Sequence, residues 1–220
     1  MYIFFQIYQL TKKSIYFFVP IQIFICLVNL YLANSTQDIL YILYVPMWKS
    51  RSLLELMILT LNFISTLIAL YTFMGIEFGP FSNYIFTRTK KFRFLINKNI
   101  VLFCYSVIIG FFFYLEYLLM IKFSFNIILN IKLLIIYILL IYIIYLLAYI
   151  TTLIFKSNQI SLTILILTYI YMIYSNINIM EYFKYMIENI SILVIFILVL
   201  NIIYFIALNK YRKPLKKESD

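Results

Sequence analysis

The chain has 220 residues, of which 65% are hydrophobic and 12% are charged, and its mean hydropathy is +1.01. A soluble domain is usually about half apolar and about a quarter charged, so this composition excludes an ordinary soluble fold. The net charge is +10 and histidine is absent. Without histidine the chain has no Ser–His or Cys–His dyad, no HExxH zinc site and no histidine proton relay, so we expect no enzyme.

The apolar runs predict an all-α polytopic membrane protein with six transmembrane helices in a single domain, residues 1–220. No loop between these runs exceeds about 25 residues, which is too short to bury a core of its own. The predicted spans are residues 14–33, 52–76, 99–121, 133–155, 160–174 and 190–208.

The first predicted span, residues 14–33, is preceded by Lys12 and Lys13 and followed by a segment without basic residues. Because Lys and Arg resist translocation, this asymmetry places the N-terminus in the cytoplasm. The preceding residues 1–13 are either an interfacial helix or an extension of the span. Cys26 in this span and Cys104 in the third are expected to be small packing residues and not a disulfide.

The second predicted span, residues 52–76, carries a narrow stripe of polar and small residues at spacings of three and four. This spacing places them on one face of the helix. Two interpretations remain open: close packing between helices, which uses small residues and side-chain hydrogen bonds, or the lining of a path or a subunit interface. The stripe consists of Asn62, Ser65, Thr66, Ala69 and Thr72.

A basic segment, residues 77–98, separates the second and third predicted spans. Glu77 is its only acidic residue, so the segment belongs on the cytoplasmic face. Gly79-Pro80 breaks the helix where it leaves the membrane. Residues 84–94 then interleave apolar and basic side chains, as is typical of a short amphipathic helix at a surface. The basic residues are Arg88, Lys90, Lys91, Arg93 and Lys98.

The later spans contain few polar residues. Glu116 lies inside the third span, and an ionisable residue there is a candidate for function, although snorkelling or pairing with a nearby basic residue also explains it. Lys156 marks a tight inner turn, and Asn201 is buried in the sixth span. Segments predicted to be inside carry 13 of the 18 Lys and Arg and outer segments carry 5, which supports a multi-pass protein of the cell membrane with both termini in the cytoplasm.

Residues 78–98 resemble the segment after the second span in small permease subunits of ABC transporters of the ABC-2 type, above all those encoded beside bacteriocin or lantibiotic immunity ATPases. In those chains a Gly-containing exit is followed by a short apolar stretch, an Arg-x-basic-basic-aromatic cluster and a Lys. Here these elements are Gly79, residues 84–87, residues 88–93 and Lys98. The resemblance implies six spans, both ends inside, and an ABC-2 permease-like bundle.

The resemblance also implies that the basic segment is a coupling helix lodged in a groove of a separate ATP-binding cassette ATPase. A second permease subunit would complete a homo- or heterodimer. The sequence contains no nucleotide-binding motif, which agrees with an external source of energy. A basic segment that rests on anionic membrane lipids is the alternative. The expected docking residues are the anchors Phe86, Phe92 and Phe94 and the charged residues Arg88, Lys90, Lys91 and Arg93.

The leading functional hypothesis is therefore the permease subunit of an ABC-type exporter for peptide or amphiphilic cargo, with no catalytic residue, cofactor or metal. One alternative is the substrate-binding component of an energy-coupling-factor importer; those chains dock through Ala-x-x-x-Ala faces, and no two alanines here are four apart. The other alternative is a stand-alone immunity or structural membrane protein. Nucleic acid is not an expected partner, because basic residues of membrane proteins normally face anionic headgroups.

Overall fold

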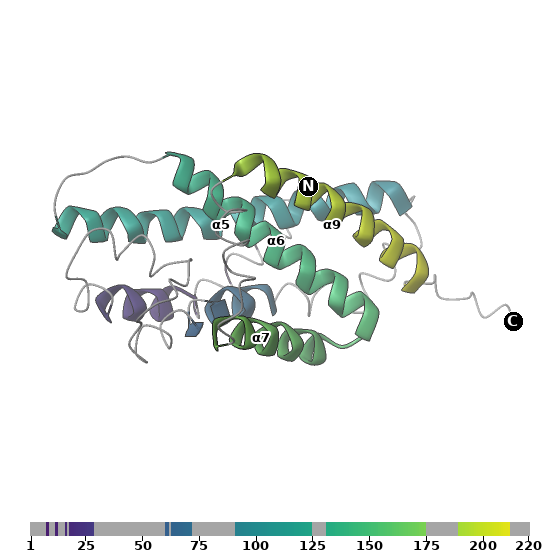
Figure 1. Ribbon diagram of the computed structural model, residues 1–220, viewed down its shortest axis with the longest axis horizontal. Helices are drawn as coiled ribbons and strands as arrows, with labels where there is room; N and C mark the ends of the chain where they lie inside the picture. The colour runs from purple at the N-terminus through teal and green to yellow at the C-terminus, as the bar shows by residue number, and fades with distance from the viewer. Residues whose placement is uncertain are drawn as a thin grey trace, which may run out of the picture.

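The computed structural model describes residues 8, 12, 16, 18–28, 60, 61, 63–71, 91–124, 131–174 and 189–211. Within this part of the chain nearly every residue is helical and none lies in a strand, which confirms the all-α prediction (Figure 1). Two shorter helical segments, Phe18–Val28 and residues 63–71, come first. The long helices are α5 (Lys91–Ser124), α6 (Ile131–Phe155), α7 (Asn158–Tyr174) and α9 (Ile190–Tyr211).

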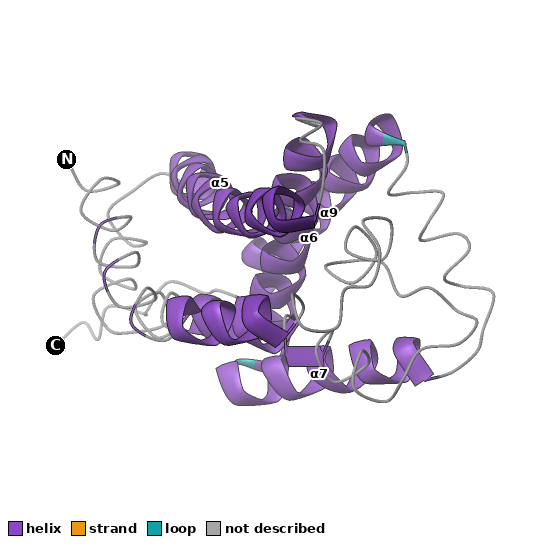
Figure 2. Ribbon diagram, turned by 90° about the vertical axis from the view of Figure 1, so that its left-hand side faces the viewer, coloured by secondary structure: helices purple, strands orange, loops and turns teal. Residues whose placement is uncertain are grey.

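Helix α6 occupies the centre of the described structure. It contacts α5, α7 and α9, and the end-on view shows α5 and α7 on opposite sides of it (Figure 2). Its sequence is almost continuously apolar, and a helix that is apolar all round is typical of a buried position. The other long helices therefore pack around α6.

Helices α5 and α6 run in opposite directions and approach closely. The Phe103 ring meets the Tyr142 ring edge-on at 5.6 Å, and Gly110 of α5 lies against Ile138 of α6. A Cβ atom on Gly110 would be 2.8 Å from Cγ1 of Ile138 and 3.2 Å from its Cα. Only glycine therefore fits at this crossing, as small residues do at close helix contacts.

Helices α6 and α9 lie side by side and run in the same direction (Figure 1). The Tyr149 ring packs edge-on against the Tyr204 ring at 5.2 Å, and Tyr142 is hydrogen-bonded to Asn201 further back along both helices. Two helices separated by one intervening span must be parallel if successive spans alternate in direction. The observed directions therefore fit the alternation expected of consecutive spans.

The two N-terminal helical segments belong to the same core. Phe18 packs edge-on against Phe112 and Phe113 of α5, with ring centroids 6.1 and 5.7 Å away. Phe63 stacks on Tyr169 of α7 with its ring centroid at 3.9 Å. Such aromatic pairs add to the packing beyond the area that they bury. These contacts place both segments against the long helices.

The connection between α6 and α7 is a tight turn of two residues. Lys156 has a φ of 53°, the left-handed region that favours glycine, and its N–H donates to the Thr152 carbonyl at 2.8 Å. The Ser157 hydroxyl then accepts from the Ile160 N–H at 3.4 Å, at the start of α7. The turn reverses the chain direction, as expected for the predicted inner turn.

Three of the described helices contain stretches long and apolar enough to cross a membrane: Ile96–Leu115, Leu134–Phe155 and Ile190–Lys210. Helix α7 is apolar but shorter. Four apolar side chains of α9, Ile195, Leu198, Ile202 and Ile206, are each 58–62% exposed. Soluble proteins rarely expose apolar patches of this kind, so the surface supports a membrane protein.

The start of α5 differs from the prediction. The basic segment was expected to end at residue 98 and the third span to begin at residue 99, yet α5 begins at Lys91 and continues without interruption to Ser124. The last residues of the basic segment are therefore the first two turns of a long helix. At a rise of about 1.5 Å per residue, α5 is about 50 Å long, well beyond the roughly 30 Å of a bilayer core.

Candidate functional site

The stripe on the second predicted span faces the inside of the molecule where it is described. Ser65, Thr66 and Ala69 are each 1% exposed, whereas Tyr71, on the opposite side of the helix, is exposed. The helical repeat separates these two faces, as the spacing in the sequence indicated. The other two residues of the stripe, Asn62 and Thr72, lie outside the described residues.

Ser65 joins this helix to the first one. Gln22, on the segment Phe18–Val28, donates a hydrogen bond from Nε2 to the Ser65 hydroxyl at 2.6 Å. Gln22 is only 8% exposed, so the bond is buried. The neighbouring Thr66 hydroxyl donates within its own helix, to the Phe63 carbonyl at 2.7 Å. Side-chain bonds of this kind hold helices together where the surroundings are apolar.

Ala69 joins the same helix to α5. The Tyr105 hydroxyl donates to the Ala69 carbonyl at 3.0 Å, and the small alanine side chain leaves room for this approach. The Tyr105 ring in turn stacks on the Tyr145 ring of α6 at 5.6 Å. Four helices thus meet at one buried group of polar side chains. We call Gln22, Ser65, Ala69, Tyr105 and Tyr145 the polar centre.

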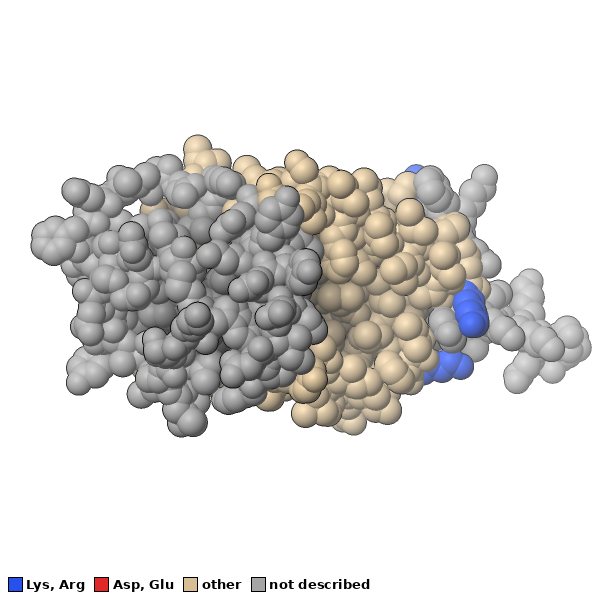
Figure 3. Space-filling view, in the orientation of Figure 1, with Lys and Arg blue, Asp and Glu red and all other residues tan. Residues whose placement is uncertain are grey.

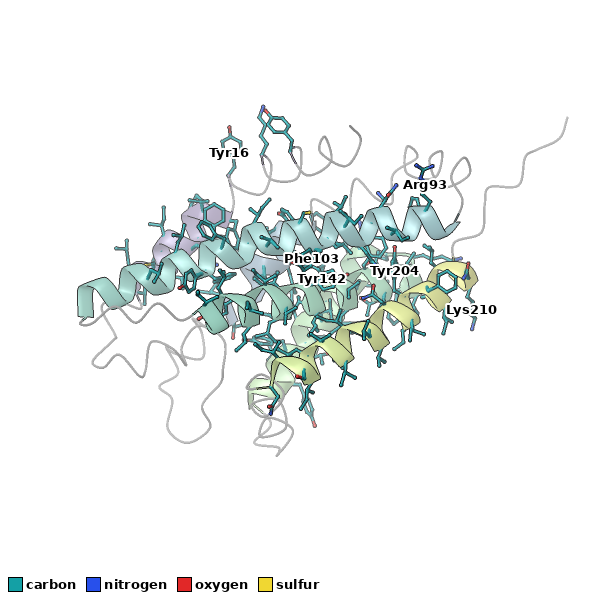
Figure 4. The ribbon with its side chains drawn as sticks, turned by 90° about the horizontal axis from the view of Figure 1, so that it is seen from above. Tyr16, Arg93, Phe103, Tyr142, Tyr204 and Lys210 are labelled. Atoms are coloured by element: carbon teal, nitrogen blue, oxygen red, sulfur yellow. The ribbon has the colours of Figure 1, made fainter. Side chains whose placement is uncertain are left out.

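A second polar group holds α9 against α5 and α6. Asn99 of α5 donates from Nδ2 to Oδ1 of Asn201 at 2.5 Å, and Asn201 donates from Nδ2 to its own Ile197 carbonyl at 2.9 Å. Tyr142 of α6 is hydrogen-bonded to Asn201 as well. Phe103 of α5 and Tyr142 of α6 lie together, and Tyr204 of α9 lies nearby (Figure 4). We call Asn99, Tyr142 and Asn201 the α9 joint.

Three exposed basic residues gather at one end of the molecule. Arg93 lies near the start of α5, Lys156 follows α6, and Lys210 lies near the end of α9. Because α5 is antiparallel to the other two helices, these three helix ends lie together (Figure 1), and Figure 4 shows Arg93 and Lys210 at that end. On the face seen in Figure 3, the Lys and Arg side chains lie at the same end. Lys and Arg on one side of a helical bundle are the pattern expected of a cytoplasmic face. We call Arg93, Lys156 and Lys210 the basic end.

Two residues of the basic segment are buried, one of which, Phe94, was expected as a docking anchor. Phe94 is 2% exposed and Lys98 is 1% exposed, and the Lys98 ammonium lies over the Phe94 ring, 5.2 Å from its centroid. Residues four apart share one face of a helix, and here that face is turned into the core, where the aromatic ring faces the cation. Phe94 is therefore not available as an anchor for a partner.

The other predicted docking residues have different positions. Arg93 is exposed at the start of α5, as docking requires. Lys91 and Phe92 lie on the first turn of α5, but their side chains are outside the described part. Phe86, Arg88 and Lys90 lie outside the described residues altogether. Glu116 lies on α5 just beyond the apolar stretch Ile96–Leu115, and its side chain is likewise not described.

The polar centre and the α9 joint consist of neutral amides and hydroxyls. Such groups bind other neutral hydrogen-bonding groups. Across the described ranges no three His, Cys, Asp or Glu side chains are grouped to hold a metal ion. Cys26 and Cys104, both described, do not form a disulfide. The side chains of these two groups can therefore form hydrogen bonds between helices or to a neutral polar ligand.

The sequence alone did not point to Gln22, Asn99 or Tyr145. Gln22 is a lone amide in an apolar span, and polar residues in such positions normally face the interior of the bundle. That rule would have singled it out. Asn99 lies beside a cluster of basic residues, which made it look like the end of a loop. Tyr145 is one of 22 tyrosines, so its type alone carried no signal.

The fold and these sites define the class of the protein only broadly. It is an all-helical chain over its described residues, with three helices long and apolar enough to cross a membrane. No protein-family model, no curated protein and no solved structure matches it. Any narrower function therefore depends on the chain's own residues.

Proposed function

We propose that this chain is a six-span, multi-pass protein of the cell membrane with both termini in the cytoplasm. Helical residues lie within each of the six predicted spans wherever the structure describes them. The basic end gathers Arg93, Lys156 and Lys210 beside three helix ends that the layout assigns to the cytoplasm. The first observation supports the six spans, and the second supports this orientation, since basic residues are retained on the cytoplasmic side.

Within that class, we propose the permease subunit of an ABC-type exporter that moves peptide or amphiphilic cargo and works with a separate ATPase and a second permease subunit. The observation that carries this proposal is the continuity of α5. The helix begins at Lys91, in the basic segment, and includes the whole apolar stretch Ile96–Leu115. A push on its cytoplasmic end would therefore reach the membrane span directly, because a helix is a stiff rod along its axis.

The contact with the ATPase would use the exposed residues before and at the start of α5. Arg93 is exposed, whereas the next residue, Phe94, is buried, so the docking surface would extend no further than Arg93. The buried pair of Phe94 and Lys98 would then fix the start of α5 to the core. In this arrangement the basic segment binds the partner and the buried pair transmits the movement.

The first experiment tests the docking surface. We expect Arg93→Glu to weaken binding to an ATP-binding cassette ATPase encoded beside this chain by about 1–3 kcal/mol, which is roughly 5- to 150-fold, because a rim charge is reversed. Lys210→Glu is the matched control, since it reverses an exposed charge at the same end on α9. Loss of binding with Arg93→Glu alone supports the proposal. Unchanged binding with Arg93→Glu, Arg88→Glu and Lys90→Glu combined contradicts it.

The second experiment tests the continuity of α5. Asn97→Pro would interrupt the helix between the docking surface and the apolar stretch, because proline removes a backbone donor and clashes with the preceding turn. We expect the ATPase to bind this variant normally while its ATP hydrolysis no longer responds to cargo. Asn97→Ala is the control and should retain the response. A normal response in Asn97→Pro would exclude coupling through a rigid α5.

A stand-alone structural or immunity membrane protein is the second candidate. The burial of Phe94 favours it, because it removes one of the aromatic anchors expected on a docking surface. This candidate predicts no ATPase in the purified complex and full biological activity in Arg93→Glu. The two candidates therefore differ in the same pull-down experiment.

A further inference from the structure

The polar centre contains two buried polar atoms that have no hydrogen-bond partner in the described part of the chain. They are the amide oxygen Oε1 of Gln22 and the hydroxyl of Tyr145. Gln22 is 8% exposed and Tyr145 is fully buried. An unpaired polar atom in an apolar interior costs about as much free energy as a lost hydrogen bond. The cost is higher in a membrane, where bulk water cannot replace the missing partner.

The neighbouring polar groups are already engaged. The Ser65 hydroxyl accepts from Gln22 Nε2, so Gln22 is fixed with its oxygen turned away from Ser65. The Tyr105 hydroxyl donates to the Ala69 carbonyl, so its proton cannot serve the Tyr145 hydroxyl. The two unpaired groups therefore need a partner that is not one of these side chains.

The two unpaired groups are complementary in their chemistry. An amide oxygen only accepts hydrogen bonds, whereas a phenol hydroxyl donates one and accepts others. They are connected through the stacked Tyr105 and Tyr145 rings and the helix that carries Ser65 and Ala69. A small neutral molecule that both donates and accepts hydrogen bonds could satisfy either group.

We propose that the polar centre is a water-binding site inside the helical bundle. Bound water donates to Gln22 Oε1 and accepts from the Tyr145 hydroxyl, either as one molecule or as a short chain. Buried waters in proteins typically make about three hydrogen bonds to polar groups that otherwise lack partners. This water joins the first two helical segments to α5 and α6. The site does not depend on the proposed transport function. It would place water beside the helix that carries Ser65 and Ala69.

The direct test is X-ray radiolytic labelling of the full-length protein in lipid nanodiscs, with the label read by mass spectrometry. Radicals formed from bound water oxidise the side chain beside it, even when bulk solvent cannot reach that side chain. Tyr145 and Tyr149 are both fully buried on α6, so bulk exposure alone predicts equal and slow labelling. We expect Tyr145 to be labelled several-fold faster than Tyr149. Equal rates would overturn the proposal.

A variant provides an independent readout. Tyr145→Phe removes only the hydroxyl and keeps the ring that stacks on Tyr105. If water satisfies the hydroxyl, its removal lowers the midpoint of unfolding in an SDS titration, because a hydrogen bond is lost. If the hydroxyl is dry, its removal relieves a penalty and the midpoint rises. A raised or unchanged midpoint would contradict a water-binding site.

The effect of Gln22 on the labelling rate completes the test. Gln22→Met keeps the length of the side chain but removes the accepting oxygen. We expect the labelling of Tyr145 to fall towards the rate of Tyr149 in this variant, because the water loses one of its partners. Leu27→Met, an exposed change on the same helix, is the control and should leave the rate unchanged. Fast labelling of Tyr145 that persists in Gln22→Met would place any water elsewhere and exclude the proposed site.

Discussion

Helices α6 and α9 are both almost wholly apolar, yet they occupy different environments. In an 18-residue apolar window of α6, 61% of the residues are buried, compared with 28% in the corresponding window of α9. Hydropathy alone does not separate them, since both qualify as membrane-crossing helices. The difference must therefore come from which side chains the two helices present to their neighbours.

Helix α6 carries small and aromatic residues on the faces that touch its neighbours. Tyr145, Ala148 and Tyr149 are fully buried, and the Ala148 carbonyl accepts from Ser161 of α7 at 3.0 Å. Helix α9 instead presents β-branched and leucine side chains outwards and meets the bundle through Asn201 and Tyr204. Where hydrophobicity does not drive association, packing and hydrogen bonding decide which helix is central.

The largest expected difference between the two helices concerns leucine truncation. Leu146 of α6 is fully buried and Leu198 of α9 is 59% exposed. We expect Leu146→Ala to destabilise the protein by about 2 kcal/mol or more, because it leaves a cavity between packed helices. Leu198→Ala should change stability by less than about 0.5 kcal/mol, as surface substitutions usually do. SDS unfolding in lipid–detergent micelles measures both, and equal effects would remove the distinction between the helices.

Gly110 offers a smaller effect at the contact between α5 and α6. A methyl group there would overlap Ile138, including its backbone, so the helices must separate. We expect Gly110→Ala to destabilise the fold by about 1–3 kcal/mol, the usual cost of overpacking. Adding Ile138→Ala should restore only part of the loss, since the Ile138 backbone remains in the way. Full tolerance of Gly110→Ala would show that α5 does not approach α6 this closely.

Parts of this fold follow from the sequence with little ambiguity. The fourth span was predicted for residues 133–155 and the helix is Ile131–Phe155, because a continuous apolar run leaves few other structures. The continuity of α5 through residue 99 was not predicted, because the closely spaced basic residues favoured a short surface helix separate from the span. The structure places Lys98 over the Phe94 ring in the core, and this contact depends on tertiary packing that local hydropathy does not contain.

The same limit applies to the polar centre. The stripe on the second span was visible as a spacing pattern, and the described members Ser65, Thr66 and Ala69 do share a buried face. Their partners Gln22 and Tyr105 were not visible, because pairing between helices depends on register and rotation. A spacing pattern along one helix therefore predicts a buried polar face. It does not predict which residues of the neighbouring helices contact that face.

The smallest expected effect concerns the α9 joint, where α9 depends on few polar contacts. Asn201→Leu removes the bonds to Asn99 and Tyr142 and leaves Asn99 without its acceptor. Asn209, which is exposed on the same helix, provides the control variant Asn209→Leu. Interhelical hydrogen bonds in membrane proteins are worth about 0.6 kcal/mol on average, with a maximum of about 1.7 kcal/mol. We expect Asn201→Leu to cost an amount in this range and Asn209→Leu almost nothing.

A double-mutant cycle tests whether the joint is the cause of that loss. Asn99 Oδ1 has no partner in the described part of the chain, and the Asn201 amide group donates instead to the Ile197 carbonyl. Asn99→Leu therefore removes an unpaired acceptor as well as a bond, and the double variant Asn99→Leu/Asn201→Leu should be more stable than the sum of the single changes implies. Strictly additive losses would show that the two amides do not interact, and α9 would then be held to the bundle by packing alone.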